Sequence, residues 1–246
     1  MKHGRICWAV AVALVLCSVQ SFGATFSFSD AALAAAVRSA AGLAGTYPDP
    51  IDTSQVQGVG FTTLDAHGLG IVTLTGLENC TDLTTLDLAF NNIASLTPLA
   101  ALNSLTYLDL GNGNPQSVGF DPLATGTNLL TGFAELNGKT TLQYLNLAGN
   151  TGITDINPIS SMTGLQHLIL GSQTVSDWLP FSYIAFQLQT FVTVNCGFTD
   201  SQVSSNLTSA SGMKRLMIIN ETGVTSIGAL TGMNPDHADF SGTQVD

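Results

Sequence analysis

Three aspartates recur at a constant interval in the first half of the chain, at Asp65, Asp87 and Asp109, each directly after a leucine. If their segments are neighbouring strands of one sheet, the carboxylates stack about 4.8 Å apart. Oxygen ligands at such a spacing can hold Ca²⁺. A row of solvated carboxylates explains the same pattern without an ion, and we favour that interpretation. The sequence therefore predicts no metal site and no cofactor, and it marks these aspartates as the place where a cation would bind if one does.

The histidines do not form a metal site in the arrangement that the sequence predicts. Beyond the N-terminal leader they are His67, His167 and His237. His167 and His237 fall three strands apart in the repeat described below, about 14 Å, whereas zinc ligands lie about 2 Å from the ion. We therefore interpret all three as surface histidines.

No stretch of the sequence carries a complete catalytic motif. The G-x-S-x-G and H-E-x-x-H patterns are missing. The segment GFAELNGKT, which begins at Gly132, resembles a phosphate-binding loop, but five residues instead of four separate its glycines. In the repeat described below, Cys80 and Cys196 would lie about five strands apart. That is about 24 Å, whereas the α-carbons of a disulfide lie within about 7 Å of each other. We expect two free thiols and a chain that is not an enzyme.

The N-terminus has the pattern of an export signal. Lys2 and Arg5 precede an apolar run from Cys7 to Val19, and small polar residues follow as far as Ala24. The run is too short for a helix that crosses a bilayer core of about 30 Å. The sequence predicts a signal peptide at residues 1–24, cleaved after Gly23 or Ala24, no membrane span, and a secreted or cell-surface protein.

The composition argues against nucleic acid as a partner. Loss of the leader would leave four basic residues against seventeen acidic ones. A chain of this charge repels phosphate backbones. Since 45% of the residues are hydrophobic, the chain can nevertheless bury a core.

An L-x-x-L-x-L segment recurs at a nearly constant interval along most of the chain. Its first positions are Phe61, Leu83, Leu105, Leu142, Leu165, Leu188, Met213 and Pro235. The clearest unit, LTTLDLAFNNIASLTPLAAL, adds an asparagine at Asn91 and has the pattern of a leucine-rich repeat, in which only stacked units bury the leucine row. The predicted fold is an α/β solenoid. It is a leucine-rich-repeat horseshoe of about eight repeats over residues 61–246, with a parallel sheet on the concave face.

The segment before the repeats has a helical period, and we expect residues 25–60 to form an N-terminal helical cap. Ser29 or Asp30 would cap the helix. The residues predicted to share its apolar face are Leu33, Ala36, Val37 and Ala40. This opening, FSDAALAAAVR, and TPLAAL in the repeats together resemble the internalin-like bacterial surface proteins. The resemblance implies a right-handed horseshoe and a protein-binding role, without identifying the partner.

On the concave face, the strand residues between the buried leucines form three outward columns because strand side chains alternate. The first half of this face is acidic, and the second half should expose one apolar area with tyrosines at its edge. The members of this area are Tyr107, Tyr144, His167, Ile169, Val192, Val194, Met217 and Ile219. We predict that it binds the protein partner. The alternatives are that degenerate repeats merely drift toward apolar residues, or that a missing C-terminal segment covers them.

Several departures from the repeat carry further expectations. One step is much longer than the others, and its extra residues near 113–128 form either a ligand-contacting projection or a tolerated surface loop. In the last repeats Gln173, Cys196, Glu221 and Thr243 replace the asparagine, so we expect looser turns there. The repeats continue to Val245 with no closing cap. This leaves an alternative function, in which the chain is a structural spacer or the N-terminal fragment of a larger surface protein.

Overall fold

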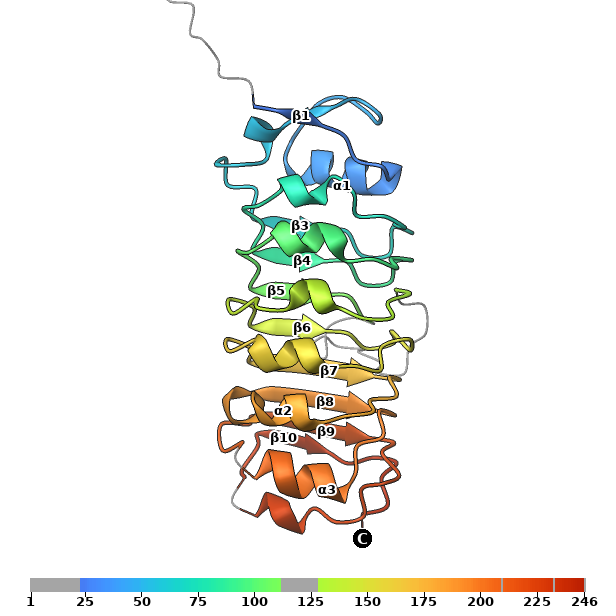
Figure 1. Ribbon diagram of the computed structural model, residues 1–246, viewed down its shortest axis with the longest axis vertical. Helices are drawn as coiled ribbons and strands as arrows, with labels where there is room; N and C mark the ends of the chain where they lie inside the picture. The colour runs from blue at the N-terminus through green and yellow to red at the C-terminus, as the bar shows by residue number, and fades with distance from the viewer. Residues whose placement is uncertain (1–22, 112–127, 209, 232, 246) are drawn as a thin grey trace, which may run out of the picture.

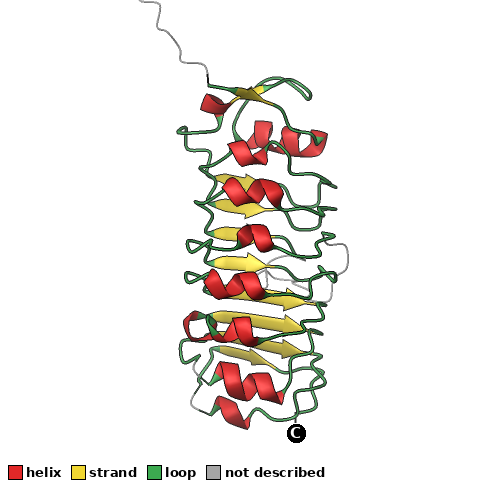
Figure 2. Ribbon diagram, viewed as in Figure 1, coloured by secondary structure: helices red, strands yellow, loops and turns green. Residues whose placement is uncertain are grey.

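The computed structural model describes residues 23–111, 128–208, 210–231 and 233–245. Nearly all of the predicted signal peptide and most of the predicted loop at 113–128 lie outside the described residues. The described chain forms a stack of coils, with strands along one side and short helical segments along the other (Figures 1 and 2).

Eight parallel strands, one from each coil, form one sheet in chain order. They are β3 (Thr63–Asp65), β4 (Thr85–Asp87), β5 (Tyr107–Asp109), β6 (Tyr144–Asn146), β7 (His167–Gly171), β8 (Thr190–Val194), β9 (Arg215–Ile219) and β10 (His237–Asp239). The register pairs Leu86 with Leu108, and Leu145 with Leu168. All four are fully buried in one core. The predicted solenoid is therefore confirmed.

The return side of the coils consists of short helical segments. These are η2 (Leu77–Asn79), η3 (Thr97–Ala101), η4 (Ala134–Leu136), η5 (Asn157–Ser161), α2 (Leu179–Ser182), η6 (Ala185–Gln187), α3 (Asp200–Gln202), η7 (Val203–Leu207) and η8 (Gly228–Leu230), and a further short segment, η1 (Thr53–Gln55), precedes the first coil. Before some of them, a side chain accepts the first backbone N–H group of the segment. Asp155 accepts from Asn157 at 2.8 Å, and Asp177 accepts from Leu179 at 2.9 Å. In these two coils the return segment therefore begins at a defined residue.

A column of buried amides links each coil to the one before it. Asn91 donates from Nδ2 to the carbonyl oxygens of Ala66 and Leu88, at 2.9 and 3.0 Å, and accepts backbone N–H groups of the preceding coil. Asn128 and Asn150 make the corresponding bonds in the next coils. The predicted loop at 113–128 therefore ends before Asn128, which is buried in this column.

In later coils, residues other than asparagine occupy this column, and their side chains still hydrogen-bond to the backbone of neighbouring turns. Gln173 donates to the carbonyl oxygen of Leu147. Glu221 accepts the backbone N–H of Cys196 at 2.7 Å and that of Phe198 at 2.9 Å. The expectation of looser turns at these two positions is wrong, because longer side chains reach the same backbone groups.

The N-terminal segment contains strands β1 (Thr25–Phe26) and β2 (Ile51–Asp52), which pair antiparallel, and helix α1 (Ala31–Ala40). Asp30 caps α1 by accepting the N–H groups of Ala32 and Leu33, and it also accepts the N–H of Val72 at 2.9 Å. Leu33 is buried in the core.

The predicted apolar face of α1 needs one correction. Ala34 is buried, whereas Ala40 is exposed. Helix α1 contacts β3, the strand at the edge of the sheet (Figure 1). That residues 25–60 serve as an end cap stays a prediction, which this contact supports.

Candidate functional site: the outer face of the sheet

We call the side of the sheet that points away from the leucine core the outer face. Its predicted columns are in register. The middle column is Asp65, Asp87, Asp109, Asn146, Ile169, Val192, Met217 and Asp239. The column before it is Thr63, Thr85, Tyr107, Tyr144, His167, Thr190, Arg215 and His237. The structure thus brings the predicted site residues together on one surface.

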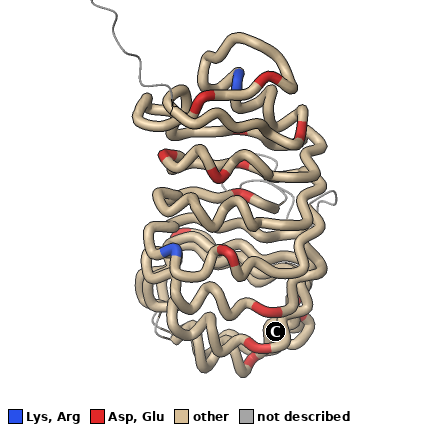
Figure 3. The backbone as a smooth tube through the Cα atoms, turned by 45° about the horizontal axis from the view of Figure 1, so that its top comes forward, with Lys and Arg blue, Asp and Glu red and all other residues tan. Residues whose placement is uncertain are grey.

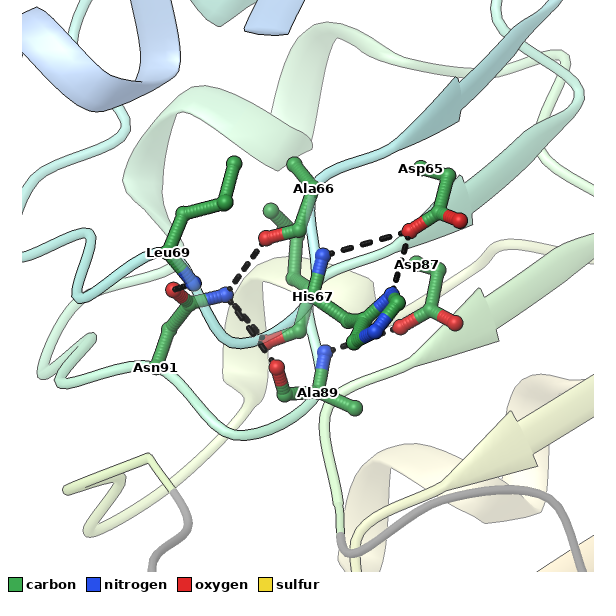
Figure 4. Close-up of polar contacts among 8 residues, drawn as sticks. Asp65, Ala66, His67, Leu69, Asp87, Ala89 and Asn91 are labelled. Atoms are coloured by element: carbon green, nitrogen blue, oxygen red, sulfur yellow. Dashed lines mark hydrogen bonds and ion pairs between the residues drawn. The ribbon is translucent and has the colours of Figure 1, made fainter.

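The N-terminal end of the outer face is polar and accessible. His67 lies two residues beyond Asp65, so both side chains point the same way, and Nδ1 of His67 lies 2.6 Å from Oδ1 of Asp65 (Figure 4). The side chains are 59% and 68% exposed. The hydrogen bond raises the pKa of His67 and lowers the pKa of Asp65. This pairing was not predicted, although the i, i+2 spacing could have indicated it.

The predicted aspartate row divides into two environments. Ligand atoms of Asp65, His67 and Asp87 lie within 4.8 Å of one another, a grouping that could hold a cation. Asp109, the third predicted member, is outside this group and is fully buried. Burial raises the pKa of Asp87 and raises that of Asp109 to about 7. The row is therefore not uniformly solvated, contrary to the interpretation we favoured from the sequence.

Asp109 lies at the boundary between the acidic and the apolar parts of the outer face. Its Oδ1 accepts the N–H of Gly111 at 2.9 Å, and its Oδ2 accepts the hydroxyl of Tyr144 at 3.5 Å. The rings of Tyr107 and Tyr144 stack with their centroids 4.2 Å apart and 8° between their planes. Burial raises the pKa of both tyrosines.

The second half of the outer face is apolar, as predicted, but it is not exposed. Ile169, Val192 and Val194 are fully buried, and Tyr144, Met217 and Ile219 are 6%, 9% and 7% exposed. With Ala148 these six residues form a hydrophobic cluster separate from the leucine core, and Tyr107 packs against it. We call it the outer cluster. The expected exposed patch is therefore wrong, because alternation along a strand fixes the side on which a side chain lies and not its contact with solvent.

Two predicted members of the site remain partly accessible. Tyr107 and His167 are half-buried. Nδ1 of His167 lies 2.9 Å from the hydroxyl of Thr190, and burial lowers the pKa of His167. His167 and His237 lie on β7 and β10, with two strands between them.

The lysine and the two cysteines considered from the sequence are all buried in the structure. Lys139, the lysine of the loop-like GFAELNGKT segment, is buried and donates from Nζ to the carbonyl oxygens of Leu102 at 2.9 Å and Ala100 at 3.3 Å. It is therefore not placed to bind phosphate. Cys80 and Cys196 are free and buried, as predicted, and burial raises the pKa of their thiols to about 12 and about 11.

Across the described ranges, no helix combines the length and apolar composition that crossing a bilayer requires.

Comparisons with known proteins agree with this architecture. A sequence profile of leucine-rich repeats in two copies matches residues 81–125, and a second leucine-rich-repeat profile matches residues 138–156. No curated protein sequence matches the chain at a significant level.

Two solved structures of Listeria monocytogenes proteins have a similar fold. The crystal structure of internalin C2 aligns with a TM-score of 0.61 and 22% identity, over 88% of this chain and 94% of that one. A second internalin, InlF, aligns with a TM-score of 0.55 and 19% identity, over 89% of this chain and 77% of that one. The repeat matches, the eight-stranded parallel sheet and these two alignments show that the chain has a leucine-rich-repeat solenoid fold similar to that of the internalins.

Proposed function

We propose that this chain is an exported recognition module that binds a protein partner through the outer face of its sheet. Leucine-rich-repeat solenoids present such extended surfaces to ligands. The observation that carries the proposal is the set of exposed polar side chains at the N-terminal end of this face, Thr63, Asp65 and His67. The leucine core does not need them, and Thr63 and Asp65 lie in register with residues of the neighbouring strand β4.

The burial of the outer cluster changes which residues should contact the partner. Ile169 and Val192 have no accessible surface, so we assign them a packing role. Tyr107 and His167 stay in the proposed site as half-buried residues at the edge of the cluster. The accessible part is acidic, so the partner should offer Lys, Arg or other hydrogen-bond donors.

The secreted or cell-surface location is part of the same proposal. It is supported by the leader-like composition of residues 1–24 and by the fold. The second candidate function is a structural spacer. The observation that favours it is the unbroken sheet from β3 to β10, which could hold flanking elements apart without any ligand.

A capture experiment with matched charge changes tests the recognition role. The full chain, immobilised, would be exposed to extracellular and surface protein fractions of its source, and retained proteins would be cross-linked and quantified by mass spectrometry. Thr63→Lys with Thr85→Lys adds two charges to the outer face, whereas Ala100→Lys with Ala101→Lys adds two on the helical side, where both alanines are exposed.

We expect the outer-face variant to lose a retained protein that the helical-side variant keeps. Equal retention by both variants would contradict use of the outer face. If the wild-type chain retains nothing above a blank surface, the spacer function is favoured instead.

A further inference from the structure

The helical side of the solenoid carries three large apolar side chains in one short segment. Leu179, Tyr183 and Phe186 are 59%, 59% and 60% exposed. They lie on α2, at its C-terminal end and on η6, which follows directly. They alternate with the buried Phe181 and Ile184, so all three side chains point away from the core. We call them the helical-side patch.

Other residues of the same segment pack into the hydrophobic core and hold the segment in place. Trp178, Phe181 and Ile184 are buried there. The rings of Trp178 and Phe181 meet edge to face, with centroids 6.1 Å apart. The helical-side patch is therefore an addition to this packing and not a part of it.

Two other coils carry small or polar residues at the corresponding positions. The segment TPLAA of η3 and the segment NPISS of η5 align with LPFSY at residues 179–183. Leu179 thus takes the place of Asn157, and Tyr183 takes the place of Ser161. The fold accepts asparagine and serine at these positions, so the large apolar side chains are not required for coil formation.

The surroundings of the helical-side patch are polar and acidic. Helix α2 contacts η5 and η7, which expose Asn157 and Ser204. Asp155 and Asp177 hold equivalent positions in adjacent coils, each accepting the N–H two residues on. Ser176, next to Asp177, donates from its backbone N–H to the carbonyl oxygen of Thr154 at 3.2 Å, which places the two aspartates side by side. Both are exposed.

The size of the helical-side patch suits an anchor for a short segment. Three such side chains at this exposure present roughly 400 Å² of surface, about half of what each side of a stable protein interface buries. Surface patches of this size on a monomer are often functional. A dimer would need considerably more area than the patch supplies.

The charge around the helical-side patch also disfavours a second copy. Of the four basic side chains within the described ranges, Arg38 and Lys139 are buried, Arg215 is half-buried and Lys214 is exposed. Acidic positions recur along the stack, whereas basic ones are few (Figure 3). A two-fold contact through the patch would bring Asp177 toward its own copy, and the repulsion between them would weaken it.

We propose that Leu179, Tyr183 and Phe186 anchor a cationic amphipathic segment of a protein partner, with Asp155 and Asp177 facing its Lys or Arg side chains. This surface lies on the opposite side of the solenoid from the outer face, so it is a second interaction site. Apolar anchors give the affinity, and the aspartates give the charge preference.

The test uses the full chain and a defined probe. The probe is a fluorescent 18-residue peptide of Leu and Lys at helical spacing, and its Glu counterpart is the charge-reversed control. Binding is measured by anisotropy at two salt concentrations. The patch variant is Leu179→Asn with Tyr183→Ser and Phe186→Ser, in which the first two changes copy residues of η5. The matched control is Leu69→Ser with Val72→Ser, which removes exposed apolar side chains elsewhere.

We expect the patch variant to bind the Lys peptide at least tenfold more weakly than wild type, with unchanged melting temperature. The Leu69→Ser, Val72→Ser control should bind like wild type. Asp155→Asn with Asp177→Asn should weaken binding about threefold and reduce its salt dependence. The Glu peptide should bind at least tenfold more weakly than the Lys peptide.

Three results would overturn the proposal. The first is equal Lys-peptide affinity of wild type and patch variant, which would mean attraction to net charge alone. The second is wild-type binding to phosphatidylcholine vesicles that the patch variant loses, which would assign the surface to lipid. The third is a wild-type dimer in sedimentation velocity that the patch variant abolishes. The outer-face variant, Thr63→Lys with Thr85→Lys, should keep peptide binding, so failure of this proposal is separable from failure of the proposed function.

Discussion

The two halves of the outer face differ in strand length as well as in polarity. Strands β3 to β6 contain three residues, whereas β7, β8 and β9 contain five. The middle column holds Asp or Asn in the short strands and Ile169, Val192 or Met217 in the long ones. Strand β10, with Asp239 in this column, is again three residues long.

The side chain of the middle column explains this difference. In the short strands its oxygen accepts the N–H two residues on, as Asp87 does from Ala89 and Asn146 does from Ala148, both at 3.0 Å. This Asx turn ends the regular strand. A hydrocarbon side chain offers no such acceptor, so pairing continues for two more residues, as between Val194 and Ile219. One residue position thus sets both the length of a strand and the character of the surface above it.

The largest expected effect comes from placing a charge in the outer cluster, which tests whether this half of the outer face is buried. Val192→Lys places an ammonium group where no side-chain surface is accessible. We expect a loss of unfolding free energy of about 4 kcal/mol or more, or failure to fold. Thr63→Lys, on the exposed part of the same face, should cost less than about 0.5 kcal/mol. Chemical denaturation measures both, and a Val192→Lys variant as stable as wild type would mean that the outer cluster is open to water.

The sequence predicted the columns correctly because the repeat period fixes which residues share a strand and a side. Leu86 and Leu108 follow from that period, as do Asp65 and Ile169 in the middle column. Solvent contact did not follow, since it depends on how closely side chains from neighbouring strands pack together, as they do in the outer cluster. The role of Asn128 was missed because the extra residues interrupt the count before the asparagine column.

Asp109 belongs to the aspartate row but is fully buried, unlike Asp65 and Asp87. Its folded-state pKa of about 7 lies above the ordinary value of 3.8, so the folded protein holds this proton more tightly than the unfolded chain. The contribution of Asp109 to stability is therefore greatest below about pH 4, declines as the pH rises to about 7, and is constant above it.

Asp109→Asn should remove that decline. An amide keeps the acceptor for Gly111 and carries no charge, so the melting temperature at pH 8 should rise by several degrees, with little change at pH 4. Thermal melts between pH 4 and 8.5 measure the difference between variant and wild type. Asp65→Asn is the control, because its carboxylate is exposed and its pKa is lowered by His67. A difference that does not grow with pH would show that Asp109 is solvated.

Loss of an Asx turn should have a smaller effect than either change above. Asp87→Ala removes the acceptor for the N–H of Ala89, with an expected cost of about 1 kcal/mol. Hydrogen exchange of the Ala89 amide should accelerate, while exchange of the Leu86 amide changes less. Asp87→Asn retains the acceptor and should leave both rates close to those of wild type. Unchanged exchange at Ala89 in the alanine variant would remove the Asx turn as the cause of short strands.

The smallest expected effect is a difference between the pKa values of His67 and His167. It compares the two halves of the outer face in the folded protein. The hydrogen bond to Asp65 raises the pKa of His67, whereas burial, followed by the charge of Lys214, lowers the pKa of His167. NMR titration should therefore place His67 above the ordinary value of about 6.5 and His167 below it. Asp65→Asn should lower the pKa of His67 and leave that of His167 unchanged, because only His67 lies beside the substituted carboxylate. Equal pKa values of His67 and His167 in the wild-type protein would contradict the proposed difference between the acidic and the apolar half of the outer face.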